Sequence, residues 1–442
     1  MIKSISSRIW GPVALLLVLG STPAEAQTPR PLAANDVSIL FPMPSNEADL
    51  DNLISLSTLS GPTGPQSARL WSDADFTRIL AIAESNAGKV DGTNRQIRLP
   101  DLKQIDAWFI AGIRVDPGAP GLTAAIIDQF GQQPQVRFIA QPVTRTGNGQ
   151  IRVHDVAVHL IFGFSTSLPP TQTGCLPKTN PDMAAFIPVV RDVVALRDGL
   201  AAGQFGGTKV DTVSQPLGVH PGLSGPSAKP FRDGLKAMLE RHLSPARLGT
   251  SAIMALNNGG PEPWIFVALA KFGPQFVPIP APTLDGTQTA QMLSLLDSQM
   301  IMPPPKTNNL NPITCRSATA LPPGAALPVT DRKGVSTADF LNAPAGSVSE
   351  QRINEIVDII ADTTKSHFFN TDCLSCHTDT RRALARAKDT TASTIAPAML
   401  PKGGWNVRNF GWFQDDGPTV TRRVATETTE VVQFMNKELL GK

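Results

Sequence analysis

Residues 373–377 carry the pattern with the clearest chemistry in the chain: two cysteines three positions apart, followed directly by a histidine. Two thiols at this spacing can each add to one vinyl group of a porphyrin, and the adjacent imidazole can then bind the iron. Cys373, Cys376 and His377 are therefore the expected attachment and metal-ligating residues of one covalent haem c. Because the 442 residues include only four cysteines and six histidines, this pattern is rare by chance.

Two other chemistries use closely spaced cysteines. A redox disulfide between Cys373 and Cys376 calls for a βαβ context, whereas the surrounding residues are typical of helices and loops. A structural zinc site needs four ligands, and no second suitable pair lies nearby in the sequence. Both remain alternatives, and the spacing favours covalent haem.

The elements that must position the motif lie in residues 345–442. Ser347 and Glu350 have the spacing of a capping box, which predicts that a helix begins there. Apolar residues at helical spacing predict one amphipathic helix before the motif and one at the end of the chain. They are Ile353, Ile356, Val357 and Ile360 in the first helix, and Val424, Val431, Val432, Met435 and Leu439 in the second. The residues between the two helices are loop-rich and aromatic.

This C-terminal segment resembles the class I cytochrome c domain, through a helix leading into the Cys-x-x-Cys-His motif, an aromatic loop region and a closing helix. The resemblance covers less than a quarter of the chain and implies that a downstream methionine is the second axial ligand. Met399 is the candidate, although it lies only 22 residues beyond His377, a shorter spacing than that family uses. The alternatives are His367, Met435, or an open sixth position on the iron.

The second axial position decides between two classes of function. A methionine opposite the histidine gives a closed iron suited to electron transfer, whereas an open position permits ligand binding or peroxide chemistry. We expect an exported monohaem cytochrome that exchanges single electrons with a redox protein. The alternative is a haem enzyme or haem-based sensor with a substrate or ligand site on the N-terminal domain. The chain holds one Cys-x-x-Cys-His motif, which disfavours a dihaem peroxidase.

Basic residues gather after the motif and suggest a docking face for an acidic redox partner. An alternative is that Arg408, with Trp405, contacts the haem propionates, and a third is an ordinary solvated helix face. The basic residues between Cys376 and Phe410 are Arg381, Arg382, Arg386, Lys388, Lys402 and Arg408.

The first 26 residues have the features of a cleaved secretory signal peptide, which predicts a periplasmic protein. Lys3 and Arg8 precede a short apolar stretch, and Ala24-Glu25-Ala26 supplies the cleavage site. No later apolar stretch has the ~20 residues of a membrane span, and the net charge of +2 gives no reason to expect nucleic acid as a partner. In an oxidising compartment Cys175 and Cys315 are expected to form a disulfide, the alternative being two thiols.

The predicted fold is an α+β N-terminal domain followed by a small all-α, cytochrome c-like C-terminal domain. The predicted segments are a flexible arm (27–48), the α+β domain (49–302), a Pro-rich linker (303–344) and the haem domain (345–442). Helical spacing is found near residues 76–83, 185–196 and 235–242, and apolar strand-like runs near 107–115, 135–143, 151–164 and 263–272. The α+β domain contains no catalytic motif. His154 and His159, five apart in one predicted strand, point to opposite faces and predict no shared metal site.

Overall fold

The structure is a computed structural model, and it describes residues 30–62, 68–85, 102–119, 121–122, 127, 131–167, 179–255, 264–279, 292–293, 300–302, 350–364, 373–384, 394–402, 408–414 and 417–441. The chain divides into two compact units, Met1–Pro31 and Leu32–Lys442, and every element below belongs to the second. The predicted signal peptide, the predicted linker and both Cys175 and Cys315 lie outside the described residues. The disulfide between these two cysteines therefore stays a prediction.

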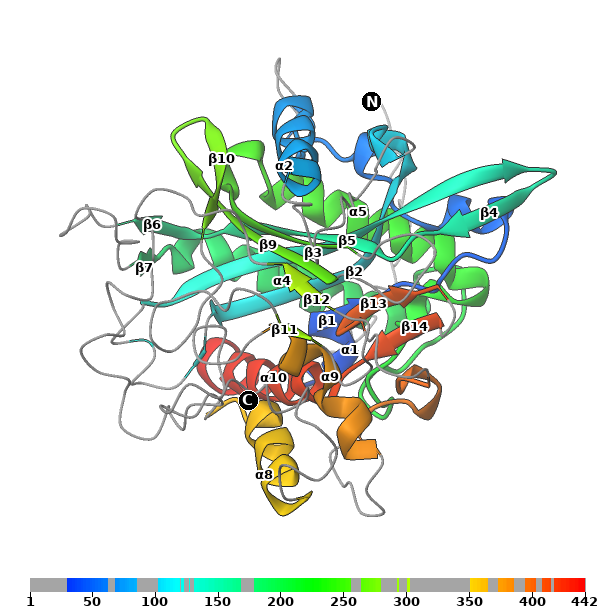
Figure 1. The fold of residues 1–442 in the computed structure, drawn as a ribbon. Helices are drawn as coiled ribbons and strands as arrows, with labels where there is room; N and C mark the ends of the chain where they lie inside the picture. Colours follow the sequence, from blue (N-terminus) through cyan, green and yellow to red (C-terminus); the bar gives the residue numbers. More distant parts are fainter. Residues whose placement is uncertain are drawn as a thin grey trace, which may run out of the picture. The chain divides into compact units, whose positions relative to one another are not determined.

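Ten strands form one sheet in the order β1-β2-β3-β5-β8-β9-β12-β11, with β4 paired to β3 and β10 paired to β9 (Figure 1). The described pairs are antiparallel except for β12 with β9. Their bounds are β1 Ser38–Leu40, β2 Trp108–Ala119, β3 Gln133–Gly147, β4 Gln150–Val153, β5 Val156–Gly163, β8 Leu248–Ala255, β9 Trp264–Phe272, β10 Gln275–Ile279, β11 Met292–Leu293 and β12 Met300–Met302. A separate pair joins β6 (Ser165–Ser167) to β7 (Thr179–Pro181).

The central strand β5 shows how the two faces of the sheet differ. Val158, Leu160 and Phe162 are buried, and the Phe162 ring lies 5.0 Å from that of Phe138 on β3, centroid to centroid. His159 and Ile161, which alternate with them and so point to the opposite face, are partly exposed. The face of β5 that carries Val158, Leu160 and Phe162 therefore belongs to the core, and the opposite face of this strand is less buried.

Three helices pack around the sheet: α2 (Asp73–Ser85), α4 (Met183–Ala202) and α5 (Ala228–His242). They confirm the helical spacing read from the sequence, because their apolar stripes are buried. Helix α4 packs against β3 and α5, and α2 packs against β9 and β10. Within the described part of the chain, no helix is both long enough and apolar enough to cross a membrane.

The C-terminal residues contradict the predicted small all-α domain. Besides α8 (Glu350–Ala361), α9 (Cys373–Leu384) and α10 (Arg422–Phe434), they contain a strand pair, β13 (Phe410–Phe413) with β14 (Gly417–Val420). Strand β13 packs on β2 and β3, and α10 packs on α1 (Ala34–Val37) and β2. The aromatic residues read as loop alternate along β13, so that Phe410 and Trp412 are both buried. The segment therefore folds onto the sheet instead of forming a separate cytochrome c domain.

Residues from Leu32 onward, within the segment predicted as a flexible arm, form regular elements that pack into the fold. Helix α1 (Ala34–Val37) leads into β1, which pairs with β2, and residues 35–41 are all buried. Leu32 exchanges two hydrogen bonds with Asn436 near the other end of the chain, at 2.7 and 3.0 Å. These long-range contacts order a segment whose composition alone suggested a loose arm.

Asp36 in α1 provides a test of this packing. Burial raises the pKa of its carboxyl to about 6, although the Ala33 amide donates to it at 2.7 Å and Arg197 lies nearby. Because the folded state holds this proton more tightly than the unfolded state, stability falls as pH rises from about 4 to about 6. In urea unfolding, the difference in free energy of unfolding between Asp36→Asn and the unaltered protein should shift in favour of the variant by roughly 3 kcal/mol from pH 4 to pH 7.

The control is Asp73→Asn, which removes an exposed carboxylate at the start of α2. Its free energy of unfolding should depend on pH as that of the unaltered protein does. If the free energy of unfolding depends on pH in the same way for Asp36→Asn and for the unaltered protein, the assignment of a raised pKa to Asp36 is wrong.

Candidate functional site

Helix α9 begins at the first cysteine of the motif and carries Cys373, Cys376 and His377 within its first turn and a half. Residues three apart lie on the same side of a helix, so the predicted attachment residues share one side of α9. The side chain of Cys373 lies outside the described residues. Cys376 and His377 are both partly buried, and the Asn409 side-chain amide donates to the Cys376 sulfur at 3.6 Å.

A second histidine, His159 of β5, lies close to α9. Its side chain is on the face of the sheet that the C-terminal segment covers, beside Arg137 of β3. Burial, together with the charges of Arg137, His377 and Arg408, holds the pKa of His159 well below its usual range. The imidazole is therefore neutral at ordinary pH. The structure thus brings together a histidine of the sheet and the histidine of the motif.

His154, the other histidine considered in the sequence, has a different setting. It lies between β4 and β5 rather than within a strand, and its Nε2 is 2.7 Å from the Thr144 hydroxyl.

Two guanidinium groups near His159 have buried N–H groups without hydrogen-bond partners among the described residues. Arg408 is 2% exposed, and it places Nη1 3.1 Å from the Met254 sulfur while its Nε and Nη2 have no partner. Burial lowers the pKa of Arg408 to about 10, with Asp155 opposing the shift. Arg137 is partly buried, and its Nε has no hydrogen-bond partner among the described residues. Burial and the charge of Arg114 lower the pKa of Arg137.

Buried cations with unsatisfied donors are costly, because a buried charge normally needs a counter-charge and hydrogen bonds. The donor set near α9 therefore fits an anionic group with several acceptor oxygens. A haem meets this requirement with its two propionates, and the same site offers the thiol and imidazole of Cys376 and His377. The described residues include no group of three or more His, Cys, Asp or Glu able to hold a bare metal ion.

The strand pair β13–β14 positions Arg408 and Asn409. The side-chain amide of Gln141 donates to the Trp412 carbonyl at 2.8 Å and accepts from its backbone N–H at 2.7 Å. Gly411 adopts φ of 140°, and a Cβ there would lie 2.6 Å from the Gln141 oxygen. Only glycine tolerates this close approach. The contact therefore fixes β13 against β3 and holds the preceding residues next to α9.

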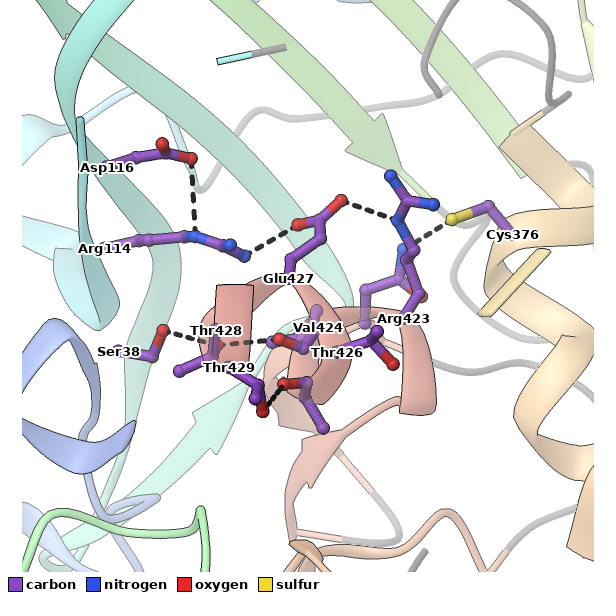
Figure 2. A network of polar contacts seen from close by, with 12 residues as sticks. Ser38, Arg114, Asp116, Cys376, Arg423, Val424, Thr426, Glu427, Thr428 and Thr429 are labelled. Carbon is purple, nitrogen blue, oxygen red and sulfur yellow. Dashed lines mark hydrogen bonds and ion pairs between the residues drawn. The ribbon is translucent and has the colours of Figure 1, made fainter. Parts of the chain in front are cut away.

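A partly buried ion-pair network, with the Glu427 side chain 31% exposed between two buried arginines, holds α10 on the same face (Figure 2). The Glu427 carboxylate accepts from Arg114 Nη1 and from Arg423 Nε, both at 2.7 Å, and Arg114 Nε lies 3.6 Å from Asp116. Burial opposes ionisation of Glu427, yet Arg423 and Arg114 together lower its pKa to about 2. Glu427 raises the pKa of Arg423 despite its burial. This network therefore connects α10 to the sheet.

The predicted and alternative distal ligands have different surroundings. Met399 ends the short 3-10 helix Pro397–Met399 and packs at Gly218, where its Cγ would lie 3.3 Å from an added Cβ. Its role as an iron ligand stays a prediction. Met435 is fully buried in the main core, and His367 lies outside the described residues.

The basic cluster is only partly described. Arg386, Lys388 and Trp405 lie outside the described residues, as do the side chains of Arg381 and Arg382. Lys402 is exposed, whereas Arg408 is buried. Arg408 therefore does not belong to a docking face.

Sequence reasoning missed His159 and Arg137. Both stand in strands whose neighbours are apolar: Arg137 between Val136 and Phe138, and His159 between Val158 and Leu160. A polar residue in such a run was a usable signal for a functional face. Its partner on the distant helix could not be found from the sequence, because that contact depends on how the C-terminal segment folds back.

Removal of the central carboxylate tests the network. Glu427→Gln removes the carboxylate that Arg423 and Arg114 share and leaves Arg114 with Asp116 at 3.6 Å, and we expect a loss of roughly 2–4 kcal/mol in the free energy of unfolding at pH 7. Because the folded-state pKa is depressed, this contribution is present above about pH 4.5 and is lost as pH falls toward 2. Urea unfolding between pH 3 and pH 7 measures both effects.

The matched control is Asp73→Asn, which breaks the exposed Arg69–Asp73 pair at 2.7 Å. Exposed pairs contribute at most about 1 kcal/mol. If Glu427→Gln and Asp73→Asn lose the same free energy of unfolding, the Glu427 network does not stabilise the fold more than an exposed ion pair does.

Three comparisons with known proteins return no relative. No protein-family model matches the chain, no curated protein matches it, and no solved structure matches it. The cytochrome c resemblance therefore has no support beyond the Cys-x-x-Cys-His residues themselves.

Proposed function

We propose that the chain is an exported c-type cytochrome that carries one covalent haem and transfers single electrons. Cys373 and Cys376 would hold the haem through two thioether bonds, each formed when a thiol S–H adds across one vinyl double bond, with sulfur bonded to one vinyl carbon and hydrogen to the other. His377 would bind the iron. The haem supplies the redox chemistry, and the chain holds it, orients it and tunes its potential.

The observation that carries this proposal is a pair of guanidinium groups near His159: Arg408, which is buried, and Arg137, which is partly buried. Each has a buried N–H without a partner in the described part of the chain. Haem propionates are carboxylates, which accept charge-assisted hydrogen bonds from arginine. One ligand therefore accounts for the cysteine spacing, the adjacent histidine and the unsatisfied donors.

The haem in this proposal is held between α9 and the sheet, not within a separate cytochrome c domain. The sheet supplies one wall of the site, which gives the large N-terminal part of the chain a direct role. We further propose a periplasmic location, supported by the features of residues 1–26, and a redox protein as the electron donor or acceptor.

Covalent haem can be tested by intact mass after expression with the haem-attachment machinery. The unaltered protein should gain the mass of one haem and show a sharp α-band when reduced. Cys373→Ala/Cys376→Ala should lose both, because neither thioether can form. Ser375→Ala, between the two cysteines, is the matched control and should retain the haem. An unaltered protein without added mass would contradict the proposal.

Arg408 provides an independent test. A buried positive charge near the iron favours the reduced state, so Arg408→Leu should lower the reduction potential by tens of millivolts. Lys402→Leu removes an exposed charge, which solvent and salt screen, and should change the potential much less. In protein produced without haem, Arg408→Leu should not destabilise the fold, since it removes unsatisfied buried donors. Equal shifts in potential for both variants would argue against Arg408 lying at the haem.

A further inference from the structure

His159 lies on the face of the sheet that the C-terminal segment covers. In the antiparallel register it stands opposite Ile139 on β3 and Ala252 on β8, and opposed residues point to the same face. On this face His159 is the one titratable group of β5. Its exposure is intermediate, whereas Val158 and Leu160 on the other face are completely buried. The imidazole is thus not part of the apolar core.

A series of contacts connects this face to the haem-attachment motif. Met254 lies two residues beyond Ala252, and therefore on the same face as His159. Its sulfur contacts Arg408 at 3.1 Å. Asn409, the next residue, donates to the sulfur of Cys376 at 3.6 Å, and His377 follows Cys376 directly. His159 therefore lies across from the helix that presents the proximal histidine.

We propose that His159 is the second axial ligand of the haem iron, opposite His377. This inference rests on the proposed function, since it requires the haem attached at Cys373 and Cys376. It replaces Met399, the candidate that resemblance to class I cytochromes suggested. The iron then has two imidazole ligands, one from the C-terminal helix α9 and one from the centre of the sheet.

The side chains near His159 suit this role. Arg137 on β3 and Arg408 before β13 carry positive charges close to His159. Both arginines are available to pair with the carboxylates of the propionates, so the site supplies both a ligand and counter-charges.

Two imidazole ligands have a consequence for the potential. Methionine opposite histidine raises the reduction potential of a c-type haem. The iron of this protein should therefore have a lower potential than a histidine–methionine cytochrome in comparable surroundings, and should not bind carbon monoxide readily in its reduced state.

The experiment uses the full-length protein with its haem, first without any substitution. The near-infrared charge-transfer bands and electron paramagnetic resonance of the ferric protein should be those of a low-spin iron with two imidazoles. The weak far-red methionine–iron band should be absent. A methionine signature in the unaltered protein would overturn the proposal, and this result needs no variant to fold.

Variants then identify the residue. His159→Gly should convert the iron to a high-spin form that binds carbon monoxide, and added imidazole should restore the low-spin spectrum. Met399→Leu, the matched alternative, should leave the spectrum and the potential unchanged. His159→Met should keep a six-coordinate iron but raise the potential. If His159→Gly keeps the original spectrum, or if Met399→Leu changes it, the proposal is wrong.

Intact mass separates this failure from failure of the proposed function. A protein that carries haem but is insensitive to His159 substitution contradicts only the ligand assignment. A protein that carries no covalent haem contradicts both.

Discussion

A single carboxylate among several arginines governs how the C-terminal segment lies on the sheet. Glu427 is the group that both Arg114 of β2 and Arg423 of α10 contact at 2.7 Å, and its charge also offsets the effect of Arg114 on Arg137. With this carboxylate in place, α10 can cover a face of the sheet rich in positive charge. Arg408 has Asp155 as an opposing charge, yet two of its buried N–H groups have no partner in the described part of the chain, and these free donors favour an anionic ligand.

Local patterns in the sequence predicted the local elements well. Helical spacing predicted the buried stripe of α2, which consists of Phe76, Ile79, Leu80 and Ala83. The apolar run at 135–143 lies within β3. These predictions succeed because helix and strand periodicities are set by residues a few positions apart. The Cys-x-x-Cys-His motif begins helix α9, although the sequence pattern predicted a loop-rich segment between two helices there.

The errors concern contacts between residues distant in the chain. The arm near Leu32 is ordered by Asn436, and the residues of β13 form a strand because Gln141 and Gly411 fit against each other. Composition in those segments suggested loops, and nothing nearby in the sequence specifies the partner. For the same reason no role was assigned to His159 from the sequence. Its proposed role depends on helix α9, which begins more than two hundred residues later in the chain.

The two hydrogen bonds between Leu32 and Asn436 span 404 positions, and they have a consequence for the order of folding. The edge strand β1 and helix α1 are covered by α10, including the contact of the Ser38 and Thr428 hydroxyls at 2.8 Å. A chain that emerges from the N-terminus onward must therefore wait for its last helix before this edge of the sheet is protected. Until then the backbone N–H and C=O of Leu32 lack their Asn436 partner. Such a high-contact-order topology folds slowly, so the unfinished chain has a long interval in which a chaperone can bind it.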